Sequence, residues 1–153
     1  MLEEPQIVET TARPVAAIRL TVPRDEIREV MGPGHRELMD AVAAQGAGPA
    51  GAWLTHHFQR PSESFDFAIC VPVSKPISPV GRVKPSELPA ATVVRTIYRG
   101  PYEGLAKAWG EFETWIAKRG YKTAPNLWEV YVAGPESSPD PASFRTELNQ
   151  PLI

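Results

Sequence analysis

The sequence has little of several features that mark specialised classes of protein. Its 153 residues contain one cysteine, Cys70, so an internal disulfide and a cysteine-based metal cluster are excluded. No apolar run approaches the length that spans a membrane, and the N-terminal MLEEPQ lacks the basic and hydrophobic regions of a signal peptide. We therefore expect a cytoplasmic protein without a membrane segment.

Basic residues are not in surplus either. The sequence has 16 Lys and Arg against 18 Asp and Glu, which gives a formal net charge of -2. Proteins that neutralise phosphates need clustered Lys and Arg. We therefore expect no direct binding of nucleic acid.

Motifs of nucleophilic and metal-dependent catalysis are also missing. There is no GxSxG sequence, and Cys70 lies between apolar residues with no basic neighbour that would lower its pKa. His56 and His57 are adjacent in an expected strand, so they point to opposite faces and cannot chelate one ion together. The segment Gly32-Pro33-Gly34 is not followed by the Lys-Ser or Lys-Thr of a phosphate loop. The sequence predicts no metal site and no cofactor.

What the sequence does contain is enough apolar material for one domain, residues 1–153. The hydrophobic fraction is 42%, and 17 prolines and 11 glycines are spread along the chain rather than massed in one tract. This distribution predicts short elements joined by sharp turns.

An internal repeat with a spacing of about 74 residues organises the chain. Two apolar helical series each end at a glycine that can cap a helix. The aligned pairs include Met31 with Leu105, Leu38 with Phe112, Val42 with Ile116, Gly46 with Gly120, and Pro61 with Pro135. After a five-residue insertion in the second copy, Phe65 aligns with Phe144. Each half reads strand, helix, strand, strand. We predict an α+β fold of two tandem βαββ modules, about 5–75 and 82–153, with pseudo-twofold symmetry, antiparallel sheets, two main helices and a ligand cleft between the halves.

The helices and first strands have clear signals. Residues 15–22 and 91–98 are the expected opening strands. In the first half, a helix starting at Pro23 is expected to break at 32–34 before a longer helix. In the second half, a helix over about 102–119 carries an apolar face that we expect to be structural first: Leu105, Ala108, Trp109, Phe112, Trp115 and Ile116.

In the last two strands of each half, successive residues point to opposite faces of the sheet, which divides their side chains into two sets. The mostly apolar set is expected to lie under the helices: Leu54, His56, Phe58, Trp128, Val130 and Val132. The other face carries Trp53, Thr55, His57, Leu127, Glu129 and Tyr131, and we expect it to be joined by Asp66, Ala68, Cys70, Arg145, Glu147 and Asn149 from the last strands. A cleft between two such mixed faces is the expected ligand site.

Glu129 is the most informative residue because it interrupts an apolar strand. A carboxylate there is costly to dehydrate without a donor or a cation, and the partner is either Arg145 across the strands or a ligand. Trp53, Tyr98 and Tyr131 are candidates for an aromatic cage around a flat cation. Trp109 belongs either to the core or to the groove.

The stretch YRGPYEGL-KAW-EF-W, followed by NLWEVYVAGPESSPD and RTELNQPL, resembles the GyrI-like small-molecule-binding domain. This family is also known as the effector-binding domain of AraC-type and MerR-type multidrug-sensing regulators. The resemblance implies two βαββ modules and a groove for large, often aromatic and cationic compounds. It assigns the ligand-contacting glutamate to Glu129 and a second motif glutamate to Glu147. Tyr98 departs from the pattern, since many relatives have histidine there.

The predicted ligand-binding residues are Glu129, Tyr131, Trp53, Tyr98, Trp109, His57, Leu127 and Glu147. A structural role for Glu147 stays open. Because the two modules use the whole chain, we expect a standalone member without a DNA-binding head.

Three functions remain. The first is binding of a hydrophobic or cationic small molecule, to sequester it or to sense it for an unknown protein partner. The second is hydrolysis of cyclopropane-bearing alkylating compounds, as in one branch of the resembling family, with Glu129 as general base. The third is a protein-interaction module.

Overall fold

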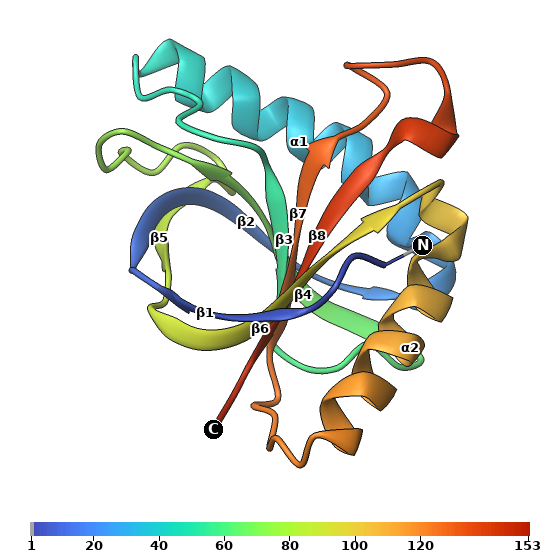
Figure 1. Cartoon of the computed structure of the whole chain (residues 1–153). Coiled ribbons are helices and arrows are strands. Elements are labelled where there is room, and N and C mark those ends of the chain that lie inside the picture. Colours follow the sequence, from blue (N-terminus) through green and yellow to red (C-terminus); the bar gives the residue numbers. More distant parts are fainter. Residues whose placement is uncertain (1) are drawn as a thin grey trace.

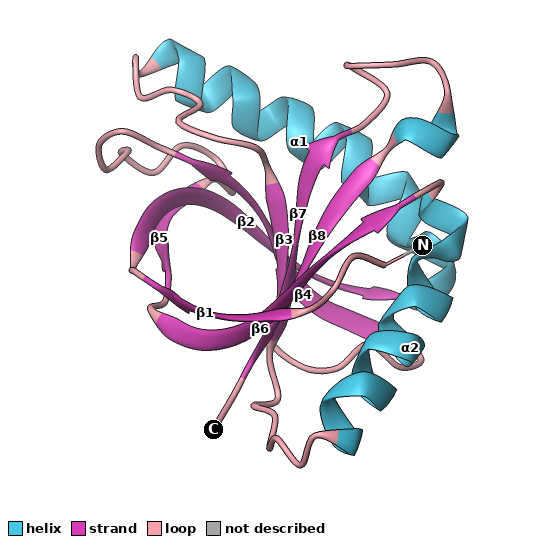
Figure 2. Cartoon of the chain, viewed as in Figure 1, coloured by secondary structure: helices cyan, strands magenta, loops and turns pink. Residues whose placement is uncertain are grey.

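The computed structural model describes residues 2–153, which form one antiparallel sheet and two main helices (Figures 1 and 2). The strands are β1 (Gln6–Thr10), β2 (Arg13–Pro23), β3 (Leu54–His57), β4 (Ser64–Pro72), β5 (Lys84–Leu88), β6 (Ala91–Arg99), β7 (Leu127–Ala133) and β8 (Arg145–Pro151). The helices are α1 (Ile27–Ala44) and α2 (Leu105–Lys118), with 3₁₀ turns at Arg24–Glu26, Tyr102–Gly104 and Pro141–Ser143. The predicted α+β class is confirmed.

The strand order β1-β6-β8-β7-β3-β4-β2-β5 shows the two modules directly. Each module contributes three of its strands to one half of the sheet, and the halves join where β3 pairs with β7. In that pairing Thr55 lies opposite Glu129, the residue that the 74-residue repeat aligns with it. The pseudo-twofold axis therefore passes through the Thr55–Glu129 pair, which agrees with the predicted symmetry.

The outermost strands tie the modules together. Strand β1 begins the first module in the chain but pairs with β6 of the second, whereas β5 begins the second module and pairs with β2 of the first. The sheet curls between these edges, and Figure 1 shows β1 and β5 on the same side of the resulting half-barrel. Each edge strand therefore adds hydrogen bonds to the module that does not contain it in sequence.

Both helices pack on the sheet face that carries Thr55 and Glu129. Ile69 lies opposite Thr55 and packs in the apolar cluster with the α1 residues Leu38 and Val42. Leu148 lies opposite Glu129 and packs with α2. This arrangement places the groove between α1 and α2, directly over the pseudo-twofold axis.

The predicted assignment of faces to helices was wrong. Leu54 and Trp128 do not lie under the helices but inside the curl of the sheet, where they pack with Ala17 and Val93. Cys70 lies opposite Leu54, so it also lies on this inner face and not in the cleft. Alternation identifies two faces but cannot tell which one a helix covers when the curled sheet buries both.

Helix α1 runs through Pro33 without the predicted break. Proline inside a helix removes a hydrogen bond and costs about 3 kcal/mol. Burial of Leu38 and Val42, both 0% exposed, stabilises the continuous helix against this cost. Gly34 lets α1 approach the sheet closely, because a Cβ at that position would lie 2.5 Å from Ile69 Cδ1.

Two glycines of α1 make a matched test of this close approach. Outside its chain neighbours, a Cβ at Gly32 would meet nothing within 4 Å, but Pro33 disfavours the helical backbone of a preceding residue that has a Cβ, so Gly32→Ala is expected to change the free energy of unfolding by less than about 1 kcal/mol. Gly34→Ala must displace buried Ile69, and overpacking costs about 1 to 3 kcal/mol. Urea unfolding measures both. Equal changes in the two variants would contradict the packing.

Candidate ligand-binding site

A cavity of about 490 Å³ lies between α1 and α2, on the sheet face that carries Thr55 and Glu129. Its volume is in the range of small-molecule sites. Its floor is formed by Thr55, His57, Leu127, Glu129 and Tyr131. The walls come from the start of α1 and its preceding turn (Arg24, Ile27, Arg28, Met31) and from α2 and its preceding turn (Tyr102, Glu103, Leu105, Ala106, Trp109, Gly110, Glu113), and one end is formed by Arg60, Pro61 and Phe65.

Glu129 is half-buried on this floor and is held by two uncharged donors. Trp109 Nε1 donates to its Oε2 at 2.6 Å, and the Tyr131 hydroxyl donates to its Oε1 at 2.9 Å. The Tyr131 hydroxyl oxygen lies 2.8 Å from Thr55 Oγ1. Because the tyrosine proton goes to the carboxylate, the threonine hydroxyl donates to the tyrosine. Three neutral groups thus orient the carboxylate without neutralising it.

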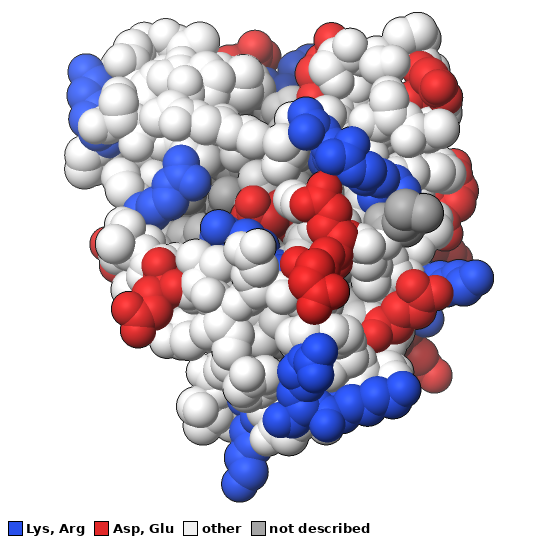
Figure 3. Space-filling model, viewed as in Figure 1, with Lys and Arg blue, Asp and Glu red and all other residues white. Residues whose placement is uncertain are grey.

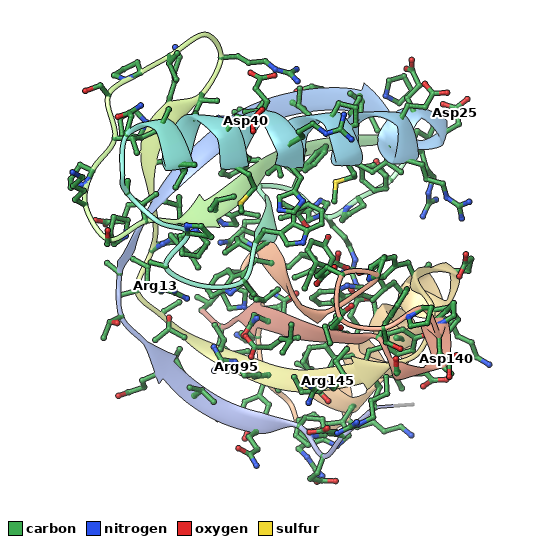
Figure 4. All side chains as sticks on the ribbon, turned by 90° about the horizontal axis from the view of Figure 1, so that it is seen from above. Arg13, Asp25, Asp40, Arg95, Asp140 and Arg145 are labelled. Atoms are coloured by element: carbon green, nitrogen blue, oxygen red, sulfur yellow. The ribbon has the colours of Figure 1, made fainter. Side chains whose placement is uncertain are left out.

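The ion pair with Arg145 considered from sequence is not formed. Within residues 2–153, Glu129 takes part in no salt bridge, and Arg145 is exposed at the start of β8. Figure 4 shows Arg145 in the second module, on the side away from α1. The carboxylate therefore faces the cavity with its hydrogen-bond donors but no cation.

Burial perturbs the titration of the floor residues. Desolvation raises the pKa of Glu129 above its ordinary value, and the hydrogen bonds from Trp109 and Tyr131 oppose this only in part. Desolvation, with a smaller effect of nearby His56, lowers the pKa of His57 to about 4, so His57 is neutral near pH 7. His57 Nδ1 is buried without a hydrogen-bond partner among the described residues.

The raised pKa of Glu129 predicts a stability effect of definite sign. The folded protein binds the Glu129 proton more tightly than the unfolded chain, whose ordinary pKa is 4.5. The stabilising contribution of this proton is complete below pH 4.5 and is lost as pH rises through the folded pKa. The stability of the wild type minus that of Glu129→Gln should therefore fall with rising pH and then level off. Urea unfolding between pH 4 and 8 measures this difference, and an increase with pH would contradict it.

The structure brings five of the eight predicted site residues together at the cavity: Glu129, Tyr131, Trp109, His57 and Leu127. Three lie elsewhere. Tyr98 is buried under α2, where its hydroxyl donates to the Pro101 carbonyl at 2.8 Å. Trp53 lies beside the cavity and stacks on His35.

Glu147 is on the opposite face of the sheet. Arg95 lies 3.3 Å from its Oε1, and Asn149 Nδ2 donates to the same oxygen at 3.1 Å. Its charge is therefore compensated by the protein itself, as the structural alternative supposed. Among the described residues, no group of three or more His, Cys, Asp or Glu side chains is arranged to hold a metal ion.

Sequence reasoning missed most of the walls. Tyr102, Leu105, Arg28 and Met31 line the cavity from the first turns of the helices and the turns before them. A signal was present, since the repeat aligns Arg28 with Tyr102 and Met31 with Leu105. The helical pattern predicts a packing role for Leu105 and leaves Trp109 open between core and groove, although the first turn of the helix also overhangs the floor.

Charged residues of both signs surround the cavity. Arg60 and Glu113 form an ion pair at one end, while Arg24 and Arg28 are exposed at the start of α1. The face in Figure 3 likewise has Lys and Arg interspersed with Asp and Glu. Within residues 2–153, no helix has the length and hydropathy needed to cross a membrane.

The fold and the cavity define an α+β domain with a small-molecule-sized pocket between two repeated modules. The GyrI-like small molecule binding domain matches residues 3–152, and the chain belongs to this family. The recognition made from sequence is confirmed. A comparison with curated proteins found no match.

Solved structures share the fold over nearly the whole chain. The crystal structure of the EcmrR C-terminal domain has a TM-score of 0.85 and 23% identity, covering 98% of this chain and 97% of that one. In an EcmrR–DNA complex the TM-score is 0.85 with 24% identity, and the match covers 97% of this chain but 57% of the EcmrR chain. SAV2435 bound to tetraphenylphosphonium has a TM-score of 0.70 and 15% identity, covering 99% and 94%. A hydrolase from Listeria innocua has a TM-score of 0.66 and 11% identity, covering 98% and 92%.

Proposed function

We propose that this protein binds small aromatic cations in the cavity between its modules, either sequestering them or sensing them for a partner. The observation that carries the proposal is Glu129, a desolvated carboxylate on the cavity floor that is held by neutral donors and has no cation among residues 2–153. The membership in a small-molecule binding family supports a ligand of this size.

The preference for a cation follows from the cost of the buried charge. Desolvation disfavours the charged form of Glu129, as its raised pKa reflects, and a cationic guest restores the lost electrostatic stabilisation. Trp109 and Tyr131 bring ring systems beside the carboxylate, and each cation–π contact contributes about 0.5 to 2 kcal/mol. Leu127 adds apolar contact. The tetraphenylphosphonium complex of SAV2435 also supports a guest of this class.

The arginines at the cavity do not oppose this preference strongly. Arg60 is paired with Glu113, and Arg24 and Arg28 are exposed to solvent, where ions and water screen their charge. Glu129 is further from solvent and is therefore screened less. A guest that reaches the floor should experience mainly the carboxylate.

A pair of probes of similar shape and different charge tests the proposal. Methyltriphenylphosphonium is cationic, whereas triphenylphosphine oxide is neutral. We expect calorimetric titration at pH 7.5 to show the cation binding at least about tenfold more tightly than the oxide, a difference of about 1.4 kcal/mol. Equal affinities, or no binding of the cation, would reject it.

Hydrolysis is a second candidate, favoured by the same raised pKa of Glu129. A carboxyl group whose pKa is raised by burial is a better general base, and it could align a water molecule for attack on a strained ring. The likeness to the Listeria innocua hydrolase is a likeness of fold. Mass spectrometry after incubation with a cyclopropane-bearing electrophile tests this activity. Product formed by the wild type but not by Glu129→Gln would support it, and recovery of unchanged compound from both would remove it.

A further inference from the structure

The cavity is one-sided about the pseudo-twofold axis. On one side of the Thr55–Glu129 pair, His57 lies opposite Leu127, and both line the cavity. On the other side the Tyr131 amide donates to the Trp53 carbonyl at 3.0 Å, which continues the same ladder. The 74-residue repeat aligns Trp53 with Leu127. The tryptophan thus occupies the place related by symmetry to the leucine of the open side.

Aromatic rings fill the other side. The Trp53 indole stacks on His35 with ring centroids 4.0 Å apart and planes 8° apart, and its ring lies 4.6 Å from that of Tyr131. Tyr102 continues the cluster, 5.9 Å from Tyr131 and 5.2 Å from Phe144. We call Trp53, His35, Tyr131, Tyr102 and Phe144 the ring cluster.

Every member of the ring cluster has a repeat counterpart that lines the open cavity. In the same order these counterparts are Leu127, Trp109, His57, Arg28 and Phe65. The two halves of the groove are therefore built from equivalent positions. Trp53, His35 and Phe144 fill one half, the other half is open to a guest, and Tyr131 and Tyr102 line the open cavity at the boundary between the halves.

We propose that the Trp53 indole occupies a second half-site, which is the counterpart of the open cavity across the pseudo-twofold axis. This indole limits the guest to the open side of Glu129. The assumption that the open side holds the guest rests on the proposed function. The natural occupant of the second half-site is a flat aromatic ring, because the His35 ring lies parallel to the indole of Trp53 and the Tyr131 ring lies beside it at a tilt of 41°. A guest with two aromatic parts joined across the axis would displace the indole, with Glu129 between the parts.

The local structure is suited to such displacement. Trp53 lies just before β3 begins, and its side chain is only partly buried, unlike the fully enclosed Trp128 of the inner face. Burial lowers the pKa of His35, although nearby Glu136 raises it in part. The neutral ring of His35 can therefore stack on a cationic or a neutral guest.

Filling the vacated half-site with indole is the first test. In Trp53→Ala, indole at ten times its dissociation constant is expected to raise the melting temperature by about 3 to 6 °C. The measurement is repeated with saturating methyltriphenylphosphonium, and the increment from indole should persist because the two sites lie on opposite sides of the axis. The wild type should show no such increment under saturation. Absence of an indole effect in Trp53→Ala, or loss of it under saturation, would overturn the proposal.

Exchanging the two repeat-related residues is the second test. Leu127→Trp should plug the open side and weaken methyltriphenylphosphonium binding at least about tenfold. Adding Trp53→Leu should restore affinity to within about fivefold of the wild type, since the cavity then opens on the other side of the same carboxylate. Failure of the double variant to regain affinity would overturn the proposal. The indole measurement without the cation uses only a neutral probe, so its outcome does not depend on whether the cation proposal holds.

Discussion

Glu129→Gln is expected to weaken methyltriphenylphosphonium binding about 10- to 100-fold at pH 7.5, a loss of about 1.4 to 2.7 kcal/mol. Glutamine keeps the shape of the side chain and an oxygen that can accept a hydrogen bond from Trp109 or Tyr131, but it removes the charge. The loss is large because the carboxylate is desolvated and weakly screened. Calorimetric titration measures it.

Two controls distinguish charge from general damage. Triphenylphosphine oxide should bind wild type and Glu129→Gln within about threefold of each other, because a neutral guest does not depend on the carboxylate charge. Glu147→Gln, on the opposite face of the sheet, should leave binding of the cation unchanged. An equal loss for both probes in Glu129→Gln would show that the substitution disturbs the cavity and not its charge.

Phe112→Ala is expected to lower the free energy of unfolding by about 3 to 5 kcal/mol. Phe112 is 0% exposed and joins α2 to the sheet through Leu148 and Val94 in one apolar cluster. Removing its ring leaves a void between the helix and the sheet, and the surrounding groups relax only in part. Urea unfolding followed by circular dichroism measures the change.

Trp115→Ala is the matched control on the same helix. Trp115 is only partly buried, and Arg119 lies over its ring at 4.2 Å from the centroid. Its removal should cost about 1 to 2 kcal/mol, since less apolar area is lost from the interior. A larger loss for Trp115→Ala than for Phe112→Ala would contradict the orientation of α2, and with it the position of Trp109 at the cavity.

The repeat explains why so much of the fold could be predicted from sequence. Leu38 of α1 and Phe112 of α2, which the repeat aligns, are both fully buried. The same register places Thr55 and Glu129 opposite each other on the axis, which is why a cleft between the halves was a correct expectation. In a duplicated chain, the alignment of the two copies also predicts tertiary structure, because symmetric modules must meet along equivalent strands.

What could not be predicted depends on contacts between distant segments. The choice of face failed because the curled sheet buries both sides, so Trp128 and Phe67 look alike in sequence. The continuity of α1 through Pro33 depends on the burial of Leu38 and Val42 against strands that are distant in sequence. The location of Glu147 was ambiguous because its partner Arg95 lies on β6, far away in sequence. Local propensity carries no information on these pairings.

The most direct test of the account is a carboxyl NMR titration of Glu129, with and without saturating methyltriphenylphosphonium. In the free protein its pKa should lie above 4.5, because burial disfavours the charge. Binding of the cation should lower that pKa, because a bound cation favours the ionised carboxylate and linkage requires the reciprocal effect. A pKa of Glu129 that does not change when the cation binds would contradict the account.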